Sequence, residues 1–279
     1  MNRFSINTWS LHERLGPSRM ARVSGDGDRI IEVVQPHPEE ISLFELPYRL
    51  AERGIGAVDI CYFHFPRTDE AYLDRLREAL AGAGVALFSL LIDFGNLTRP
   101  ASRARDLELA HVADWVRRAG YLGAKCARAV AGAGDPKDPQ AMEQAVRGYA
   151  ELADVAAEAG VRLLTENLGS FACGPATILP LLERLEGRLG LCVDFGNGRR
   201  SGQYDELRRL LPHAESIHAK PELTATGALD AADFRRCVAY AEEAGFSGPY
   251  TIVYRGPKDP WAGIAEVRDL ILAEIEPES

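Results

Sequence analysis

The stretch AEAGVRLLTE, residues 157–166, carries the pattern that decides the fold. A segment rich in alanine and glutamate ends at Gly160, and the short, mostly apolar run VRLLT follows at once. Glycine readily adopts the left-handed backbone conformation that closes a helix, and a brief apolar run suits a strand buried on both faces. The stretch therefore predicts a helix, a turn and a strand.

The same order of segments recurs along the chain, at residues 52–60, 80–92, 117–130, 187–195 and 242–253. The runs Phe4–Asn7 and Ser216–Lys220 add two further strand candidates. The eight expected strands are centred near Ile6, Ile60, Leu90, Ala127, Leu164, Val193, His218 and Ile252.

Eight alternating β and α units, each of roughly 30 residues or more, favour a closed (β/α)8 barrel, the TIM barrel of the α/β class. An open α/β sheet with a small appendage is the alternative. No shift in composition marks a domain boundary, so we expect one domain over residues 1–279.

One segment departs from the pattern. Residues Arg14–Pro38 read as a long irregular insertion after the first strand. Structureless connections of this length are uncommon in compact domains and often act as lids or binding loops. We expect either a lid or a disordered insertion here.

Composition excludes several classes of protein. The chain has 279 residues, of which 46% are hydrophobic and 26% charged, as in a folded domain. A net charge of −9 argues against nucleic-acid binding through phosphate neutralisation. No run of about 18 apolar residues could span a membrane, and the start MNRFSINTWSLHERL lacks the apolar core of a signal peptide. We therefore expect a cytoplasmic protein with neither a nucleic acid nor a membrane as partner.

Known sequence motifs exclude other chemistries. The five cysteines form no CxxC pair, so neither a disulfide framework nor a thiolate zinc site is indicated. The chain also lacks a GxxxxGK[ST] phosphate loop, a GxSxG elbow and a GxGxxG run after a strand.

Polar residues gather where the expected strands end, which is where TIM barrels build their active sites. They are Asn7, Trp9, His64, Asp93, Arg128, Glu166, Asn167, Asp194, Asn197, His218, Lys220 and Arg255. Several of them would be costly to bury without partners. A shared ligand or metal explains the set better than separate ion pairs do.

Three of these residues end strongly apolar runs on consecutive strands: Glu166, Asp194 and His218. Two carboxylates and an imidazole form a mixed oxygen and nitrogen site suited to Mn²⁺, Co²⁺, Mg²⁺ or Zn²⁺. The other interpretation is a buried charge network in which the carboxylates pair with Arg128 or Lys220. Spacing alone does not separate the two.

An ordered set of short runs carries a resemblance. They are FSINTWSL (4–11), GIGAVDICYFH (54–64), LLTENLG (163–169), CVDFGN (192–197), IHAKP (217–221) and TIVYRGPKDPW (251–261). In this order the runs resemble the xylose isomerase-like TIM barrel superfamily, the sugar phosphate isomerase/epimerase group. That superfamily also holds endonuclease IV-type enzymes, which use more metal ligands than this chain offers.

The resemblance implies a divalent metal held by a glutamate, an aspartate and a histidine on strands 5, 6 and 7. These match Glu166, Asp194 and His218. Relatives add a glutamate on strand 8, where this chain has Val253, and Arg255 stands at the following acidic position. A water or a substrate oxygen could complete the coordination of a metal with three protein ligands.

The resemblance further implies a sugar isomerase or epimerase-like enzyme of carbohydrate metabolism. It would act on a small sugar, polyol or hydroxy-carbonyl compound by proton transfer through an enediolate. Glu166 would be the base and Lys220 a second catalytic group. The expected substrate contacts are Trp9, His64, Arg128, Asn167 and Arg255.

The replacement at Val253 supports an alternative: a metal-free, repurposed or non-catalytic barrel that binds an anionic small molecule. In that case Arg255 or Lys220 would replace the cation electrostatically. Lys220 could equally be a salt-bridged structural lysine, and Arg255 could lie in the rim. In either case the partner is a small molecule, and a homo-oligomer is compatible with the sequence.

Overall fold

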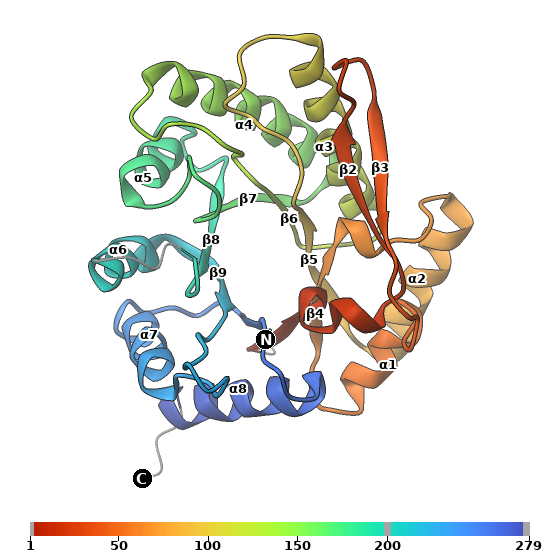
Figure 1. The fold of residues 1–279 in the computed structure, drawn as a ribbon, viewed down its shortest axis with the longest axis vertical. Helices are drawn as coiled ribbons and strands as arrows, with labels where there is room; N and C mark the ends of the chain where they lie inside the picture. Colours follow the sequence, from red (N-terminus) through yellow and green to blue (C-terminus); the bar gives the residue numbers. More distant parts are fainter. Residues whose placement is uncertain (1–2, 198–201, 276–279) are drawn as a thin grey trace.

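A closed parallel barrel forms the centre of the computed structural model, which describes residues 3–197 and 202–275 (Figure 1). Within this part of the chain, eight strands pair in the order β1-β10-β9-β8-β7-β6-β5-β4 and close on themselves. Their bounds are β1 (Phe4–Asn7), β4 (Ala57–Cys61), β5 (Ala86–Ile92), β6 (Cys126–Ala129), β7 (Arg162–Glu166), β8 (Gly190–Asp194), β9 (Ala214–Ala219) and β10 (Tyr250–Ile252). The predicted (β/α)8 barrel is confirmed, and each expected strand centre falls within one of these strands.

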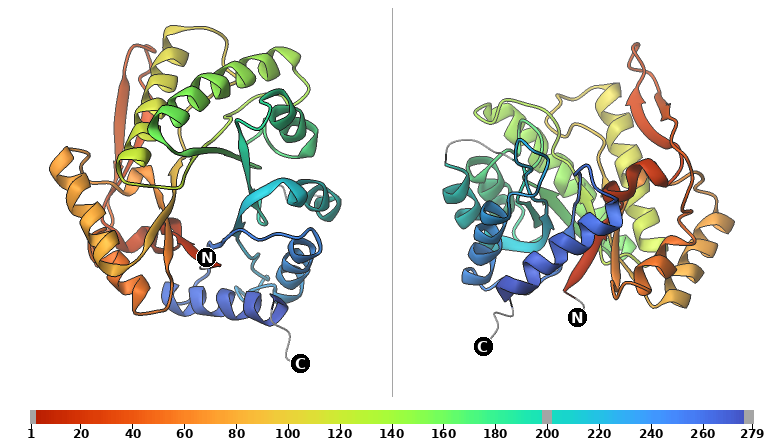
Figure 2. Two further views of the ribbon diagram at one scale, coloured as in Figure 1. Left: turned by 180° about the vertical axis from the view of Figure 1, so that it is seen from behind. Right: turned by 60° about the horizontal axis from the view of Figure 1, so that its bottom comes forward.

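Helices surround the barrel, as the views from the front and from behind show (Figures 1 and 2). They are α1 (Leu46–Ala51), α2 (Glu70–Ala83), α3 (Arg103–Tyr121), α4 (Pro139–Ala159), α5 (Pro175–Arg184), α6 (Gln203–Leu210), α7 (Ala231–Glu243) and α8 (Pro260–Ile275). Short 3-10 turns follow three of the strands or helices: η1 (Thr8–Arg14), η2 (Tyr62–His64) and η3 (Leu211–His213).

Capping residues set the limits of the helices. The Asp138 side chain accepts a hydrogen bond from the backbone N–H of Gln140 at the start of α4, and Gly160 ends that helix with a φ of 69°. Gly84 ends α2 in the same left-handed conformation, with a φ of 66°. The glycine punctuation in the sequence therefore marks helix ends for the expected reason.

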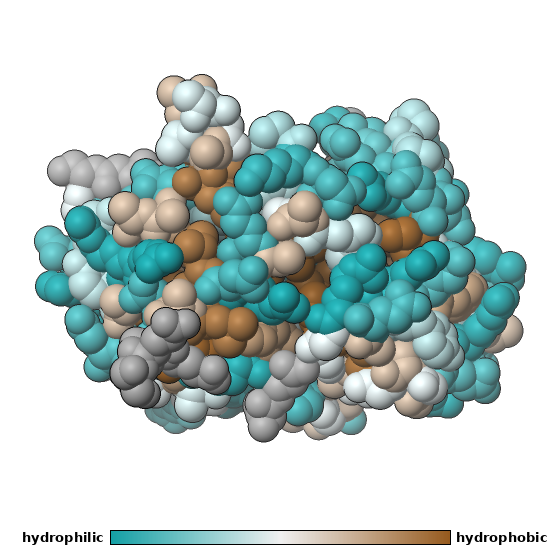
Figure 3. Space-filling model, turned by 90° about the horizontal axis from the view of Figure 1, so that it is seen from below, coloured by the Kyte–Doolittle hydropathy of each residue, from teal (hydrophilic) through white to brown (hydrophobic). Residues whose placement is uncertain are grey.

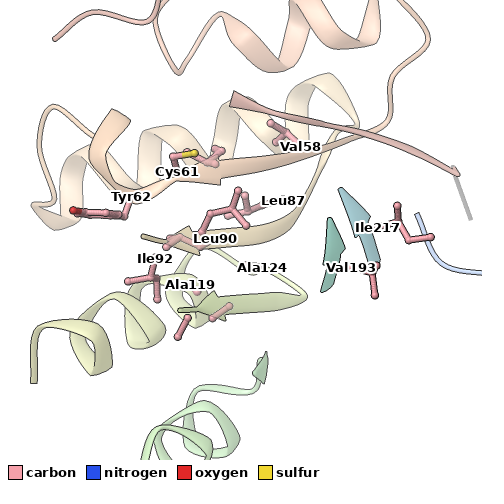
Figure 4. Close-up of a cluster of buried hydrophobic side chains, with 14 of the residues drawn as sticks. Val58, Cys61, Tyr62, Leu87, Leu90, Ile92, Ala119, Ala124, Val193 and Ile217 are labelled. Atoms are coloured by element: carbon pink, nitrogen blue, oxygen red, sulfur yellow. The ribbon is translucent and has the colours of Figure 1, made fainter. Parts of the chain in front are cut away.

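The hydrophobic core lies between the strands and the helices. The cluster of Figure 4 joins strands to a helix: Val58 of β4, Leu90 of β5 and Ala119 of α3 all belong to it, and all three are fully buried. Every residue of β8 is buried, as expected for a strand covered on both faces. A rigid wall of this kind holds the strand ends in fixed positions.

The segment Arg14–Pro38 is more ordered than an irregular insertion. It contains an antiparallel hairpin of β2 (Ser18–Val23) and β3 (Ile30–Gln35), which projects beyond the barrel in the right-hand view of Figure 2. The polar, glycine-containing stretch between the strands forms a tight turn, in which the Ser24 N–H donates to the Arg29 carbonyl over 2.8 Å. A glycine-containing turn before the β-branched run IIEVVQ is a hairpin signal that outweighed the polar composition.

The molecular surface is mostly hydrophilic on the face shown in Figure 3, with hydrophobic residues in its recesses. In the described part of the chain, no helix combines the length and the apolar character needed to cross a membrane.

Candidate active site at the barrel mouth

A cavity of about 320 Å³ opens where the strands end. It is lined by Asn7, Trp9, Met20, Cys61, Phe63, Asp93, Arg128, Glu166, Leu168, Asp194, Asn197, His218, Lys220 and Val253. Its volume falls in the usual range for small-ligand pockets, roughly 300–1,000 Å³. Most of the polar residues expected at the strand ends therefore share one cavity.

Strand pairing explains why Glu166, Asp194 and His218 converge. Asp194 of β8 is paired with His218 of β9, and Glu166 of β7 is paired with Cys192, two residues before Asp194. Residues two apart on a strand point to the same side, so Cys192 and Asp194 both face the interior. Nδ1 of His218 lies 3.4 Å from Oε2 of Glu166 and 3.9 Å from Oδ2 of Asp194.

Two cations also enter the cluster. Nε of Arg128 lies 3.0 Å from Oε2 of Glu166, and Nη1 of Arg128 donates to Oδ1 of Asp93 over 2.5 Å. Nζ of Lys220 lies 3.4 Å from Oδ2 of Asp194. The converging triad and the charge network, which spacing could not separate, occur together.

Asn197 links Glu166 to Lys220. Its Nδ2 donates to Oε1 of Glu166 over 3.0 Å, and its Oδ1 accepts from Nζ of Lys220 over 2.7 Å. The amide therefore holds the Glu166 carboxylate and the Lys220 amine in a fixed relation.

The environment sets different proton affinities for the two buried acids. Burial raises the pKa of Glu166, but the Arg128 and His218 charges outweigh burial and lower that pKa to about 2. Burial raises the pKa of Asp194, and Lys220 only partly offsets this effect. Glu166 is therefore the carboxylate that stays ionised and can accept a proton.

A further carboxylate, that of Asp59, lies on the other side of the His218 ring from Glu166 and Asp194. Nε2 of His218 lies 3.7 Å from Oδ2 of Asp59, which is buried on β4 and accepts hydrogen bonds from Ser5 and Thr251. Burial lowers the pKa of His218, but Cys192, Glu166 and the nearby Asp59 outweigh burial and raise it well above its usual value. Glu166 and Asp59 thus both stabilise the protonated imidazole.

The donor set fits a divalent cation. The buried charges of the cluster come from Asp59, Glu166 and Asp194 against Arg128, which leaves two negative charges when His218 is neutral and one when it is protonated. Buried charge without compensation is costly. Oε2 of Glu166 and Nε2 of His218 are also buried without a hydrogen-bond partner. Carboxylate oxygens and an imidazole nitrogen are ligands for Mg²⁺, Mn²⁺, Co²⁺ and Zn²⁺.

Some of the expected substrate contacts line this cavity, and others do not. Trp9 and Arg128 line the cavity, as does Val253. Arg255 instead lines a neighbouring cavity of about 500 Å³, where its guanidinium lies 4.6 Å from the centre of the Trp9 ring. Trp9 forms a wall of both cavities.

His64 and Asn167 lie behind the cavity wall. Nδ1 of His64 is 2.9 Å from the hydroxyl of Thr8, and its Nε2 is 3.0 Å from Nδ1 of His12. Asn167 exchanges two hydrogen bonds with the backbone of Asp194, at 2.6 and 2.9 Å. Asn167 thus positions the metal-ligand candidate Asp194 through its main chain.

Sequence reasoning missed Asp59, Cys192 and His12. Glu166, Cys192 and His218 each place one possible ligand atom within 4.8 Å of the others. Asp59 carried a usable signal, because an acid in the middle of the apolar run GAVDI must face a partner in the barrel. The pairing of His12 with His64 depends on how two turns meet, which local sequence does not show.

Comparison with known sequences gives a family match. The sequence pattern of the family described as xylose isomerase-like TIM barrel matches residues 47–272. No curated protein sequence matches this chain.

Solved structures match over nearly the whole chain. A structure of L-ribulose 3-epimerase has 15% identity and a TM-score of 0.72, covering 99% of this chain and 95% of that one. A D-psicose 3-epimerase structure, in the presence of D-fructose, has 13% identity and a TM-score of 0.68, covering 98% of each chain. A xylose isomerase-like TIM barrel protein from Mycobacterium smegmatis, in complex with magnesium, has 17% identity and a TM-score of 0.68, covering 98% and 96%. At these identities the likeness concerns the fold.

Proposed function

This chain belongs to the xylose isomerase-like TIM barrel family, and on that premise we propose that it is a sugar isomerase or epimerase-like enzyme. Its substrate would be a small sugar, polyol or related hydroxy-carbonyl compound. The reaction would remove a proton from carbon and return one to carbon through an enediolate. The observation that carries this proposal is the convergence of Glu166, Asp194 and His218 in one cavity of sugar-binding size.

Glu166 is the proposed base. Its carboxylate lines the cavity and stays ionised, because Arg128 and His218 keep its pKa low. A base with so low a pKa removes a proton from carbon only when the forming oxyanion is strongly stabilised. Arg128 and Lys220 supply positive charge at the same cavity wall for that purpose.

Glu166, Asp194 and His218 are the proposed ligands of a divalent cation. A cation bound there would polarise the hydroxy-carbonyl unit of the substrate as a Lewis acid. Nδ1 of His218 is the nitrogen that faces both carboxylates, while Nε2 faces Asp59. With a cation on Asp194, the Lys220 amine would keep its hydrogen bond to Asn197 and would face a substrate oxygen from the cavity wall.

Solvent exchange tests this function. A panel of ketoses and aldoses is incubated with the protein and Mn²⁺, Co²⁺ or Mg²⁺ in deuterated water, and deuterium at carbon is followed by NMR. We expect exchange on at least one sugar, lost on chelation and reduced roughly 10²- to 10⁴-fold in Glu166→Gln. Exchange that persists in Glu166→Gln would remove Glu166 as the base.

The ion pair between Lys220 and Asp194 favours a second candidate function, binding of an anionic small molecule without a metal. In that case Lys220 and Arg128 would take the ligand charge directly. Thermal stabilisation by a sugar acid or a sugar phosphate, with no exchange on any sugar with or without cations, would favour this second function.

A further inference from the structure

We infer that this site delivers protons to one face of its substrate only, and so interconverts an aldose and a ketose without inverting a carbon centre. The inference rests on the proposed function and names its reaction class. It follows from an uneven distribution of charge around the barrel mouth.

The ionisable groups of the cavity come from one half of the barrel. They are Asp93 after β5, Arg128 on β6, Glu166 on β7, Asp194 on β8, and His218 and Lys220 on and after β9. These five strands are consecutive in the barrel order. Asp93, the remaining carboxylate, follows β5, which is two strands from β7 and two strands from β1. Its carboxylate is held in an ion pair and hydrogen bond with Arg128, so it is not free to act as a second base.

Among residues 3–197 and 202–275, the other half of the barrel contributes no acidic or basic side chain to the cavity wall. Strands β10, β1 and β4, with the segments that follow them, contribute Val253, Asn7, Trp9, Met20, Cys61 and Phe63. Burial raises the pKa of the Cys61 thiol, and its Sγ donates to Oδ1 of Asn7, so it is not a thiolate base.

The geometry sets this neutral half opposite the base. In the closed order of strands, β7 with Glu166 is four positions from β1 in either direction, and Val253 follows the strand next to β1. A sugar between these walls therefore has Glu166 on one face and Trp9, Phe63 and Val253 on the other. Aromatic and aliphatic side chains can pack on a sugar ring or chain but cannot exchange its protons.

One base on one face is sufficient for isomerisation. The Glu166 carboxylate removes a proton from C1 of a ketose, the C–H electron pair forms the C1–C2 double bond, and the C2 oxygen takes the negative charge. The hydroxyl proton on the C1 oxygen moves to the C2 oxygen, with Lys220 as the carrier, and the negative charge passes to the C1 oxygen. Glu166 then returns the proton to C2 on the same face, the C1–O bond becomes the carbonyl, and an aldose results.

Inversion of a carbon centre needs a second acid or base. To epimerise a carbon, the proton must leave from one face and a new one must arrive on the other. Val253 occupies the wall from which that proton would come, so it acts as the residue that excludes epimerisation.

The stereochemistry of the products tests the inference. The wild-type protein with Mn²⁺ is incubated with the ketoses and aldoses of the panel in deuterated water. We expect each reactive ketose to give one aldose, with deuterium at C2 in a single configuration and at one of the two C1 positions of the ketose. No C3 epimer is expected.

Variants at Val253 give a matched comparison. Val253→Glu places an acid on the neutral wall, and we expect epimer formation roughly 10²-fold above that of Val253→Gln, which has the same shape without the charge. Epimers formed by the wild-type protein, with deuterium at the inverted carbon, would overturn the inference and leave the proposed function intact. Absence of exchange at every carbon would instead remove the proposed function, and the inference with it.

Discussion

At the residue scale, the central relation is the one between His218 and Asp59. The imidazole presents Nδ1 to Glu166 and Asp194 and Nε2 to the Asp59 carboxylate. A carboxylate behind a ligating histidine fixes its orientation and strengthens it as a ligand. Hydrogen bonds from Ser5 and Thr251 hold Asp59 itself in place.

Asp59→Asn tests this relation. The amide keeps the size of the side chain and an oxygen for Ser5 but removes the charge, so the affinity for Mn²⁺ should fall roughly 10- to 100-fold. Calorimetric titration with Mn²⁺ measures the affinity, and Ser5→Ala, which leaves the charge in place, should have a smaller effect. Unchanged affinity in Asp59→Asn would show that Asp59 plays no part in cation binding.

At the scale of elements, two histidines join the turns that cover one side of the mouth. His12 belongs to η1 and His64 to η2, and their ring nitrogens are 3.0 Å apart. Burial lowers the pKa of His12 to about 4 and that of His64 to about 3. His37, which follows the hairpin, and Arg255 add positive charge near His12 and lower its pKa further. Both turns are therefore held together by neutral imidazoles.

A loss of stability in acid follows from these shifts. Below the ordinary histidine pKa of about 6.5, these two histidines bind protons in the unfolded chain but stay neutral in the folded chain. The free energy of unfolding should thus fall as the pH drops from about 6.5 to about 4, by roughly 1.4 kcal/mol per pH unit for each histidine. Denaturant unfolding at several pH values should give a flatter profile for His64→Gln than for the wild type. His213→Gln, at an exposed position, should keep the wild-type slope; an equally steep profile in His64→Gln would contradict the assignment.

At the scale of elements, the sequence predicts the barrel strands but not the hairpin. Six of the eight barrel strands are preceded in the sequence by a helical segment that ends in glycine and leads into an apolar run, and the structure keeps this local pattern. The hairpin of β2 and β3 was missed, because its exposed strands and polar turn look like an irregular loop. Whether the hairpin acts as a lid stays a prediction.

At the scale of the whole molecule, the net charge of −9 is distributed in two ways. Part of it lies on the hydrophilic surface, and part is concentrated in the barrel, where the acids outnumber the fixed cations by two. The strand-end rule located Glu166, Asp194 and His218 in one cavity. It could not locate Asp59 or the turn histidines, because their contacts depend on how distant segments meet.

The central claim is that this excess of buried negative charge holds a divalent cation between Glu166, Asp194 and His218. Anomalous diffraction from crystals grown with Mn²⁺ tests it most directly. We predict one peak at roughly 2.0–2.3 Å from Oε2 of Glu166, Oδ2 of Asp194 and Nδ1 of His218. An absent peak, with Lys220 still on Asp194 and Arg128 on Glu166, would contradict the account.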